Sequence, residues 1–365
     1  MKFSPFDHEC MARALSLAGN GLFSTQPNPR VGCVVAKDGQ MLGSGWHSVA
    51  GGPHAEVLAL QEAGSGARGA TAYVTLEPCN HHGRTPPCVE ALLEAGVSRV
   101  VVAIEDPNKR VKGAGLQRLK EAGVEVESGL MAAAAEELNV GFFKRMRHGR
   151  PWVRVKLACS LDGRTALQNG NSAWISSDNS RKDVQAWRAR SSAIMTGIGT
   201  VLSDNPELTA RIDDPPLRPL RLIVDTHWRT PVGSKVLDSP DTAVVAGSDR
   251  VKIPAALKEK GVGLIALPER DGRVDLEVLI NELSAFEINE LQVEAGATLC
   301  GALLKLGLVD EFLLYQAPIL LGEGGPGLFS LGVLESIEDR THLELLESTR
   351  MGEDFRFRFR PRGGC

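Results

Sequence analysis

The chain has 365 residues, more than one hydrophobic core usually organises, so two domains are expected. Its residues are 43% hydrophobic and 24% charged, which excludes disordered, fibrous and disulfide-scaffold proteins. The 41 basic and 45 acidic residues give a formal net charge of −4, so composition provides no general attraction to nucleic acid or membranes.

The N-terminus and the cysteines predict a cytoplasmic protein. Residues 1–8 lack the apolar segment of a secretory signal, and no run of about 18 apolar residues occurs that could span a membrane. The seven cysteines are scattered and odd in number, so reduced thiols are expected. Any cysteine chemistry should therefore be metal binding or nucleophilic.

The first 130 residues alternate between helical and strand patterns. A helix is expected over 7–18, then a strand over 31–36, a tight turn at Asp38-Gly39 and a second strand ending near residue 47. The pattern continues with a helix over 53–63, a strand over 70–76, a helix over 88–95, a strand over 99–104, a helix over 114–122 and a strand over 124–127. This alternation predicts an α/β layered sheet.

A basic segment, residues 144–150, precedes Pro151 and marks the expected domain boundary. Gly149 and Pro151 interrupt regular structure, and the charge cluster is unsuited to a core. We expect a solvated linker here rather than a nucleic-acid-binding segment, because the whole chain is acidic. The expected domains are residues 1–149 and 150–365.

The second half predicts another α/β domain. Alternating apolar residues indicate a strand over 152–158, and a helix follows over 177–190. Further strands are expected near 193–197, 220–225, 242–247, 290–294 and 311–316, with a helix over 297–306 and a loop over 214–219.

Three candidate metal ligands occur in the first half. His54 begins a predicted helix, Cys79 follows a buried strand, and Cys88 begins the next helix. One nitrogen and two sulfur ligands fill three positions of tetrahedral zinc and leave the fourth for water, as in catalytic sites. Glu56, two residues after His54, can move protons between that water and a leaving group.

The spacing of the two cysteines leaves an alternative open. The zinc deaminase signature pairs H-x-E with P-C-x-x-C, whereas eight residues separate Cys79 from Cys88 here. Because this insert contains His81 and His82, a structural site with four ligands is the alternative. We favour the catalytic interpretation, since a structural site has no use for Glu56.

Three motifs resemble the pyrimidine deaminase of riboflavin biosynthesis. They are Gln26-Pro27-Asn28-Pro29-x-Val31-Gly32, then Gly52-x-His54-Ala55-Glu56, then Pro78-Cys79 followed by His82-Gly83 and Thr85-Pro86-Pro87-Cys88. The resemblance implies a cytidine-deaminase-like three-layer domain. It also implies that Asn28 and the loop 81–85 hold a diaminopyrimidine ring and its ribosyl phosphate. For Asn28, a turn residue between two prolines is the alternative.

Two segments of the second half suggest a ligand site. A strand ends in Glu294, and Gly296 opens a helix whose free N–H groups can bind phosphate. Gly296 and Gly301 do not form G-x-G-x-x-G, so a Rossmann domain is not supported, and helix capping alone could explain these glycines. The strand that carries Lys156 leads into Ser160-Leu161-Asp162-Gly163, a weaker candidate.

Together these segments resemble the reductase domain that accompanies the riboflavin deaminase, which has a dihydrofolate-reductase-like α/β fold. The matching landmarks are Lys156-Leu157-Ala158-x-Ser160-Leu161-Asp162-Gly163, Ser172-x-Trp174-Ile175, Arg188, Gly199-Thr200-Val201, Asp204-Asn205-Pro206, Leu208-Thr209, Val224-Asp225 and Glu294-Ala295-Gly296. The resemblance implies NADPH contacts at Ala158, Trp174, Thr200, Asp204, Thr226, Gly296, Ala297, Thr298, Leu299, Cys300, Gly301 and Ala302. It implies substrate contacts at Ser172, Arg188, Leu208, Arg211 and Glu294.

The chemistry of these side chains agrees with such roles. Arg188 and Arg211 can each chelate a sugar phosphate, although Arg188 could equally lie on a solvated helix face. Trp174 offers a flat surface to a ligand, or else packs in a core. Lys156 and Glu294, each at a strand end, are candidates to orient or polarise the sugar.

Both halves, in this order, resemble the bifunctional deaminase–reductase family of riboflavin biosynthesis. The first implied reaction is zinc-dependent hydrolytic deamination of 2,5-diamino-6-(ribosylamino)-4(3H)-pyrimidinone 5′-phosphate. The second is NADPH reduction of the ribosyl group of 5-amino-6-(5-phosphoribosylamino)uracil to ribityl. The implied cofactors are Zn²⁺ and NADPH, and the family implies a homo-oligomer, a dimer or larger.

Two other classes of protein remain as alternatives. A nucleic-acid-editing deaminase would carry a basic second half with exposed aromatic residues, whereas residues 151–365 are acidic and poor in aromatics. A zinc-stabilised protein that only binds a nucleotide would need no Glu56. We therefore expect small phosphorylated pyrimidines as partners, and neither nucleic acid nor membrane.

Overall fold

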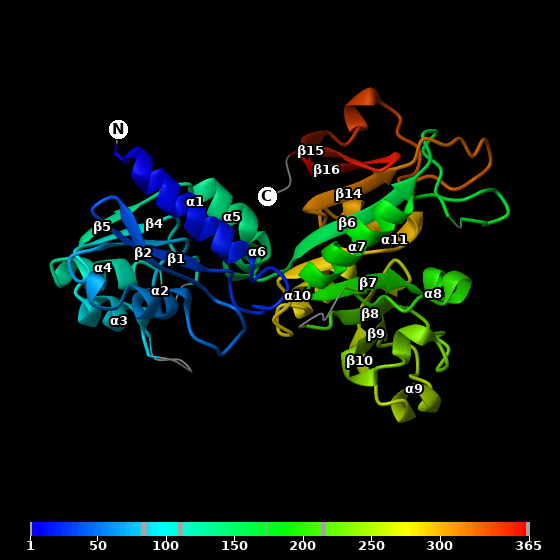
Figure 1. The fold of residues 1–365 in the computed structure, drawn as a ribbon. Coiled ribbons are helices and arrows are strands. Elements are labelled where there is room, and N and C mark those ends of the chain that lie inside the picture. Colours follow the sequence, from blue (N-terminus) through cyan, green and yellow to red (C-terminus); the bar gives the residue numbers. More distant parts are fainter. Residues whose placement is uncertain (1, 82–85, 109–111, 173, 213–216, 363–365) are drawn as a thin grey trace. The chain divides into compact units, whose positions relative to one another are not determined.

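The computed structural model describes residues 2–81, 86–108, 112–172, 174–212 and 217–362 (Figure 1). The chain divides into two compact units, Met1–Gly149 and Arg150–Cys365. Within the described residues, no helix has both the length and the apolar character needed to cross a bilayer.

The first unit is built around a five-stranded sheet with the order β2-β1-β3-β4-β5. Its strands are β1 (Gly32–Lys37), β2 (Gln40–Trp46), β3 (Thr71–Val74), β4 (Arg99–Val102) and β5 (Glu125–Ser128). Strand β1 is antiparallel to β2 and β3, whereas β3, β4 and β5 are parallel. The β1–β2 turn uses Asp38 and Gly39 with φ values of 51° and 76°, the conformation that an Asp-Gly pair favours.

Helices cover both faces of this sheet, so the unit has three layers (Figure 1). The helices are α1 (Pro5–Gly19), α2 (Ala55–Ala63), α3 (Cys88–Ala95), α4 (Ala114–Glu121), α5 (Ala132–Leu138) and α6 (Val140–His148). One core joins the sheet to α2, α3 and α4 and contains Cys33, Val74 and Leu92. A second core, on the opposite face, joins it to α1 and α5 and contains Cys10, Met11 and Tyr73.

Two glycines in β2 allow helix α2 to lie very close to the β1–β2 hairpin. A Cβ atom on Gly45 would lie 2.6 Å from the carbonyl oxygen of Ala55, and one on Gly43 would lie 2.2 Å from that of Ala59. Any larger residue at these positions would push the helix away. The close packing fixes the start of α2, where His54 is located.

Helix α6 occupies most of the segment that was expected to be a solvated linker. The helix ends at His148, and Gly149 follows with a φ of 66°. Lys144 is buried, and Phe142 and Phe143 form a core with Leu76. The linker prediction is therefore wrong for residues 144–148. Basic residues in the last turn of a helix are favoured by its dipole, and the preceding apolar residues supply the buried face.

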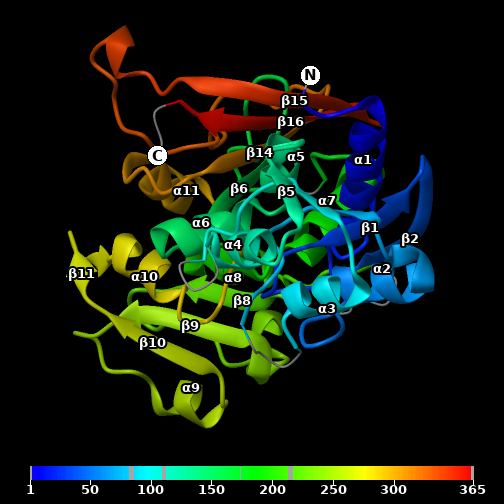
Figure 2. The ribbon, with the colours of Figure 1, turned by 90° about the vertical axis from the view of Figure 1, so that its left-hand side faces the viewer.

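The second unit contains a nine-stranded sheet with the order β10-β9-β8-β7-β13-β6-β14-β16-β15. Figure 2 shows β10, β9 and β8 of this sheet at the bottom and β14, β16 and β15 at the top. Its strands are β6 (Trp152–Cys159), β7 (Ala193–Gly197), β8 (Leu220–Val224), β9 (Ala243–Ser248), β10 (Gly263–Leu267), β13 (Glu290–Val293), β14 (Glu311–Gln316), β15 (Leu343–Met351) and β16 (Asp354–Pro361). The pairings are parallel except those of β16 with β14 and β15. Strands β11 (Glu269–Arg270) and β12 (Arg273–Val274) form a separate small hairpin.

Helices also lie on both faces of the nine-stranded sheet. They are α7 (Asp178–Arg190), α8 (Ile198–Asp204), α9 (Ala255–Glu259), α10 (Leu276–Glu282) and α11 (Ala297–Lys305). Helices α10 and α11 pack on one face around Val155, Leu279 and Leu303. Helix α7 contributes Trp187 to a smaller cluster with Leu313 on the other face.

Charged side chains take the place of apolar ones beneath α7. Arg154 is fully buried and donates hydrogen bonds to Glu290 at 3.0 Å and Glu311 at 3.1 Å. The indole of Trp187 has four guanidinium groups around it, those of Arg154, Arg190, Arg356 and Arg358, at 4.5–5.7 Å from its ring centre. Each buried acid therefore has a cationic partner, which a charge in a protein interior requires.

Candidate metal centre and cofactor cavity

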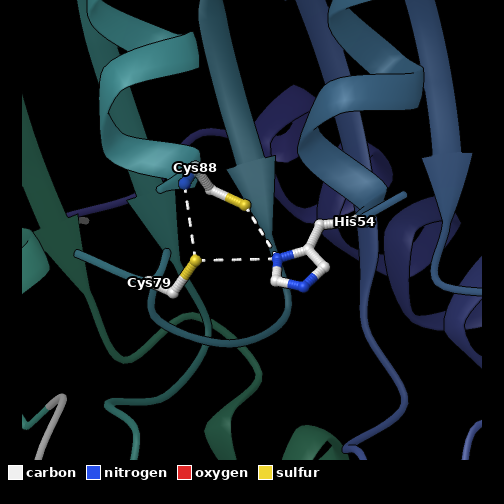
Figure 3. Close-up of side chains that lie close together, drawn as sticks. All are labelled: His54, Cys79 and Cys88. Atoms are coloured by element: carbon white, nitrogen blue, oxygen red, sulfur yellow. Dashed lines mark hydrogen bonds between the residues drawn. The ribbon is translucent and has the colours of Figure 1, made fainter. Parts of the chain in front are cut away.

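His54, Cys79 and Cys88 lie together at one end of the first unit's sheet (Figure 3). The Nδ1 atom of His54 is 3.0 Å from Sγ of Cys88 and 3.6 Å from Sγ of Cys79, and all three ligand atoms lie within 4.8 Å of one another. The structure thus brings together the three residues that the sequence predicted as ligands.

Three different elements place these side chains. His54 is the N-cap residue of α2, and Cys88 is the first residue of α3, as Figure 3 shows. Cys79 lies in the loop after β3, where its Sγ accepts a hydrogen bond from the N–H of Cys88 at 3.4 Å. Its carbonyl accepts another from Val89 at 3.2 Å. The ligand loop is therefore held against the start of α3.

Glu77 anchors the other side of this loop, a role that sequence analysis missed. Its buried carboxylate accepts hydrogen bonds from the N–H groups of Gly113 and Gly115, each at 3.0 Å, and of Asp106 at 3.2 Å. Gly113 and Gly115 lie at the start of α4, where free N–H groups attract an anion, whereas Asp106 lies in the loop that follows β4. The sequence shows an acidic residue directly before Pro78-Cys79 at the end of a predicted strand, but not the backbone groups that it binds.

The protonation of the two thiols favours a metal ion. A hydrogen bond from the Cys88 thiol lowers the pKa of Cys79 to about 4, although burial acts in the opposite direction. The same hydrogen bond and burial raise the pKa of Cys88, and the hydrogen bond with Cys79 raises that of His54. One thiolate beside a second thiol and an imidazole is a donor set that fits zinc, whose binding displaces the shared proton.

Glu56 is buried in the first turn of α2, close to this cluster. Burial raises the pKa of its carboxyl, and the nearby charge of His54 is the largest effect that opposes this. Among the described residues, His81 is exposed and outside the ligand cluster. His82 and the rest of the expected substrate loop, residues 83–85, lie outside the described residues.

Asn28 is connected to the metal centre through His47. The amide nitrogen of Asn28 lies 3.1 Å from Nε2 of His47, and Nδ1 of His47 lies 3.0 Å from the carbonyl oxygen of Pro53. Because a carbonyl can only accept, Nδ1 carries the proton and Nε2 accepts from Asn28. This leaves the Oδ1 atom of Asn28 as an acceptor. The rings of His47 and His54 pack edge to face at 5.3 Å.

A cavity of about 920 Å³ in the second unit gathers many of the residues predicted for the reductase. It lies where the chain leaves β6, β7 and β13, at the carboxyl ends of parallel strands, where α/β sheets usually bind ligands. Its wall includes Ala158, Trp174, Thr200, Asp204, Gly296 and Ala297 from the expected cofactor contacts, and Ser172, Arg188, Leu208, Arg211 and Glu294 from the expected substrate contacts.

The other expected cofactor residues do not line this cavity: Thr226, Thr298, Leu299, Cys300, Gly301 and Ala302. The hydroxyl of Thr226 accepts a hydrogen bond from Val274 at 3.3 Å. Leu299 and Ala302 pack against the apolar core, and Cys300 is buried in it. Gly301 approaches the backbone of Ser330 so closely that a Cβ atom there would lie 2.6 Å from its oxygen.

Arg188 and Arg211 differ in how they are engaged. Arg188 donates to both carboxylate oxygens of Glu294, at 2.6 and 2.8 Å, and to the carbonyl of Thr209 at 3.0 Å. Arg211 is 60% exposed, and its guanidinium is 3.7 Å from Glu207. Arg188 therefore already has strong partners, whereas Arg211 can turn toward a phosphate.

Electrostatics in this cavity centre on Glu294. Burial would raise the pKa of its carboxyl, but the charge and hydrogen bonds of Arg188 lower it to about 2. Burial lowers the pKa of Lys156, whose ammonium also lies 5.7 Å from the ring centre of Tyr315. Trp174 is 77% exposed, so the packing alternative is wrong, and Arg181 lies over its ring at 4.7 Å.

Family models match both units. The model described as cytidine and deoxycytidylate deaminase zinc-binding region matches residues 4–104, and the RibD C-terminal domain matches residues 151–357. These matches confirm the predicted order of a deaminase-like domain and a reductase domain, both of the α/β class.

Relatives match over nearly the whole chain. The riboflavin biosynthesis protein RibD of Escherichia coli strain K12 is 48% identical over 360 residues, which are 95% of this chain and 97% of that protein. RibD of Haemophilus influenzae is 43% identical over 378 residues and 100% of both chains.

Solved structures give the same result. A structure of Acinetobacter baumannii RibD has a TM-score of 0.91 and 45% identity, covering 98% of this chain and 99% of that chain. The Thermotoga maritima diaminohydroxyphosphoribosylaminopyrimidine deaminase/5-amino-6-(5-phosphoribosylamino)uracil reductase has a TM-score of 0.87 and 32% identity over the same shares. The chain belongs to the RibD family of riboflavin biosynthesis, whose members join a deaminase to a reductase.

Proposed function

We propose that this chain catalyses two consecutive reactions of riboflavin biosynthesis. Residues 1–149 deaminate 2,5-diamino-6-(ribosylamino)-4(3H)-pyrimidinone 5′-phosphate, and residues 150–365 reduce the ribosyl group of 5-amino-6-(5-phosphoribosylamino)uracil to ribityl. The observation that carries the proposal is the convergence of three zinc-type ligands beside the buried Glu56, in a chain similar to RibD along its whole length.

In the first reaction, His54, Cys79 and Cys88 hold the zinc ion. When bound, zinc would act as a Lewis acid that lowers the pKa of the attacking water toward ~7. Glu56 takes a proton from the attacking water and returns it to the amino group, which leaves as ammonia. The oxygen of Asn28, oriented by His47, accepts a hydrogen bond from the pyrimidine.

In the second reaction, NADPH supplies the hydride. The N–H groups of Gly296 and Ala297 at the start of α11 hold its pyrophosphate, and Trp174 offers a flat face. Arg211 binds the substrate phosphate. Lys156 and Glu294 would orient the sugar for reduction at C1′. The bond from C1′ to the ring oxygen would break, and that oxygen would take up a proton from solvent.

The decisive experiment is Glu56→Gln in the full chain. The variant should retain zinc and lose ammonia release, because the amide has the size of the carboxyl but cannot shuttle the proton. Its retained zinc shows that the first unit is folded, and oxidation of NADPH with the deaminated pyrimidine shows that the second unit is folded. Ammonia release at the wild-type rate would contradict the proposal.

We also propose that the enzyme works in the cytoplasm as a homo-oligomer, on small molecules rather than nucleic acid. A site built from two ionisable thiols requires the reduced cysteines that this compartment maintains. Exposed apolar side chains at Val333, Ile337 and Leu345 favour assembly of identical chains, which sedimentation of the purified protein measures.

A further inference from the structure

Two loops that leave neighbouring strands form part of the wall of the reductase cavity. The first loop, residues 160–172, follows β6, and the second loop, residues 317–328, follows β14. The two strands pair in parallel as far as Cys159 and Gln316, so both loops begin at the same edge of the sheet. The first loop contributes Thr165, Ala166, Gly170 and Ser172 to the cavity, and the second contributes Pro326 and Leu328.

The two loops are hydrogen-bonded to each other. Neither contains a helix or strand, so their polar backbone groups need other partners. The N–H of Leu161 donates to Ile319 at 2.8 Å, and that of Thr165 donates to Pro326 at 3.0 Å. A Cβ atom on Gly325 would lie only 2.1 Å from the carbonyl oxygen of Ala166. The loops therefore touch through their backbones.

Charged side chains of the first loop also contact the second loop. The guanidinium of Arg164 donates a hydrogen bond to the carbonyl oxygen of Gly325 at 3.1 Å, and a second charged contact is made by Asp162. Its carboxylate accepts hydrogen bonds from the consecutive N–H groups of Leu321 at 3.1 Å and Gly322 at 2.8 Å. Gly322 has a φ of 77°, which L residues rarely adopt. A hydrogen bond from Ser160, together with these two, lowers the pKa of Asp162 to about 2, so the carboxylate is ionised at neutral pH.

Asp162 is exposed and does not line the cavity, so it can act only through the loops that it joins. We propose that Asp162 is a positioning residue that ties the first loop to the second and thereby holds the cavity wall in the shape that binds NADPH. The inference rests on the proposed reductase function of this cavity. Without the Asp162 contact, a smaller fraction of molecules has the cavity wall in the conformation that binds NADPH. The apparent Kd for NADPH rises by the inverse of that fraction.

The test uses the full-length, zinc-loaded chain with Asp162→Ala, Asp162→Asn and the control Glu323→Gln, an exposed carboxylate in the second loop. Calorimetry gives the Kd for NADP⁺, and mass spectrometry follows trypsin cleavage after Arg164 in the first loop. We expect Asp162→Ala to bind NADP⁺ about tenfold more weakly and to be cleaved about tenfold faster. Asp162→Asn should lie between, since it keeps one acceptor oxygen, and Glu323→Gln should match wild type.

Kinetics separate positioning from chemistry. The KM for NADPH should rise in Asp162→Ala while kcat at saturating NADPH falls less than about threefold. Urea unfolding of the second unit shows whether each variant is folded. If Asp162→Ala is unfolded, the result for Asp162→Asn decides. Wild-type Kd and cleavage rate in Asp162→Asn and Asp162→Ala would overturn the proposal. A wild-type chain that fails to bind NADP⁺ would instead contradict the reductase function, and the cleavage assay would still test the loop contact.

Discussion

The guanidinium of Arg188 and the carboxylate of Glu294 form a two-point ion pair, with Nε 2.6 Å from Oε1 and Nη2 2.8 Å from Oε2. The pair links α7 to the residue that follows β13, and both side chains line the reductase cavity. Each is only 12% exposed, so the loss of one would leave the other charged with little access to water.

Replacement of Arg188 by Met should therefore damage both stability and reduction. We expect a loss of about 3–5 kcal/mol in the free energy of unfolding of the second unit, because Glu294 would lose its partner. Displacement of Glu294 should reduce NADPH oxidation about 100-fold. Arg188→Lys, which keeps the charge but not the two-point geometry, should be intermediate. Urea unfolding and NADPH absorbance measure these effects, and full reductase activity in Arg188→Met would contradict them.

Arg211→Gln should affect substrate binding alone. The side chain is exposed, so we expect a change in unfolding free energy within about 0.5 kcal/mol. The KM for the phosphorylated pyrimidine should rise about tenfold, whereas a dephosphorylated substrate should show no difference from wild type. Steady-state kinetics with both substrates check this, with Arg250→Gln as an exposed arginine outside the cavity wall. An equal change for both substrates would show that Arg211 does not bind the phosphate.

Cys79→Ser and Cys88→Ser should each reduce the zinc content and abolish ammonia release. A serine hydroxyl does not ionise near neutral pH and is a poor zinc ligand. NADPH oxidation should continue in both variants, because the second unit has its own core. Elemental analysis of the purified chains measures zinc, and Cys10→Ala is the matched control in a thiol outside the cluster. One zinc ion per chain in Cys88→Ser would exclude that residue as a ligand.

The buried acids of the second unit predict its behaviour in acid. The pKa of Glu311 is lowered to about 2, because Arg154 and Arg358 outweigh the effect of burial, and that of Glu294 is lowered to a similar value by Arg188. A depressed pKa gives stability that is full above the ordinary value of 4.5 and disappears as the pH falls toward 2. Urea midpoints measured between pH 5 and 3 should fall. In Glu311→Gln the urea midpoint at pH 5 should be lower than in the wild type and should fall less steeply with pH. An equal slope in the variant and the wild type would show that Glu311 does not cause the loss of stability in acid.

The regular elements and the metal ligands were predictable because local patterns determine them. The Asp38-Gly39 turn, helix α3 and strand β7 follow from turn chemistry and apolar periodicity. The ligand triad could be recognised because zinc demands particular donors, wherever they lie in the chain. The residues of the reductase cavity were predicted from family resemblance instead, because exposed residues such as Trp174 and Arg211 have no distinctive spacing in the sequence.

What could not be predicted depends on partners distant in sequence. Residues 144–148 of helix α6 were predicted as a linker, because their basic side chains look solvated until the core around Phe143 is known. Glu77 and His47 act through backbone groups of other segments, which no local pattern reveals. Strand β16 was not predicted, although Phe355, Phe357 and Phe359 alternate with arginines at the period of two that is typical of a strand.

The ionic cluster beneath α7 has a consequence for how this protein can change over evolutionary time. Arg154 forms ion pairs with both Glu290 and Glu311 inside the sheet layer, so replacing any one of the three alone takes a partner away from a buried charge. Substitutions at these positions are therefore strongly epistatic, and each becomes tolerable only when its partner changes as well. As the sequence of the second unit changes in evolution, Arg154, Glu290 and Glu311 should either all be kept or be replaced together.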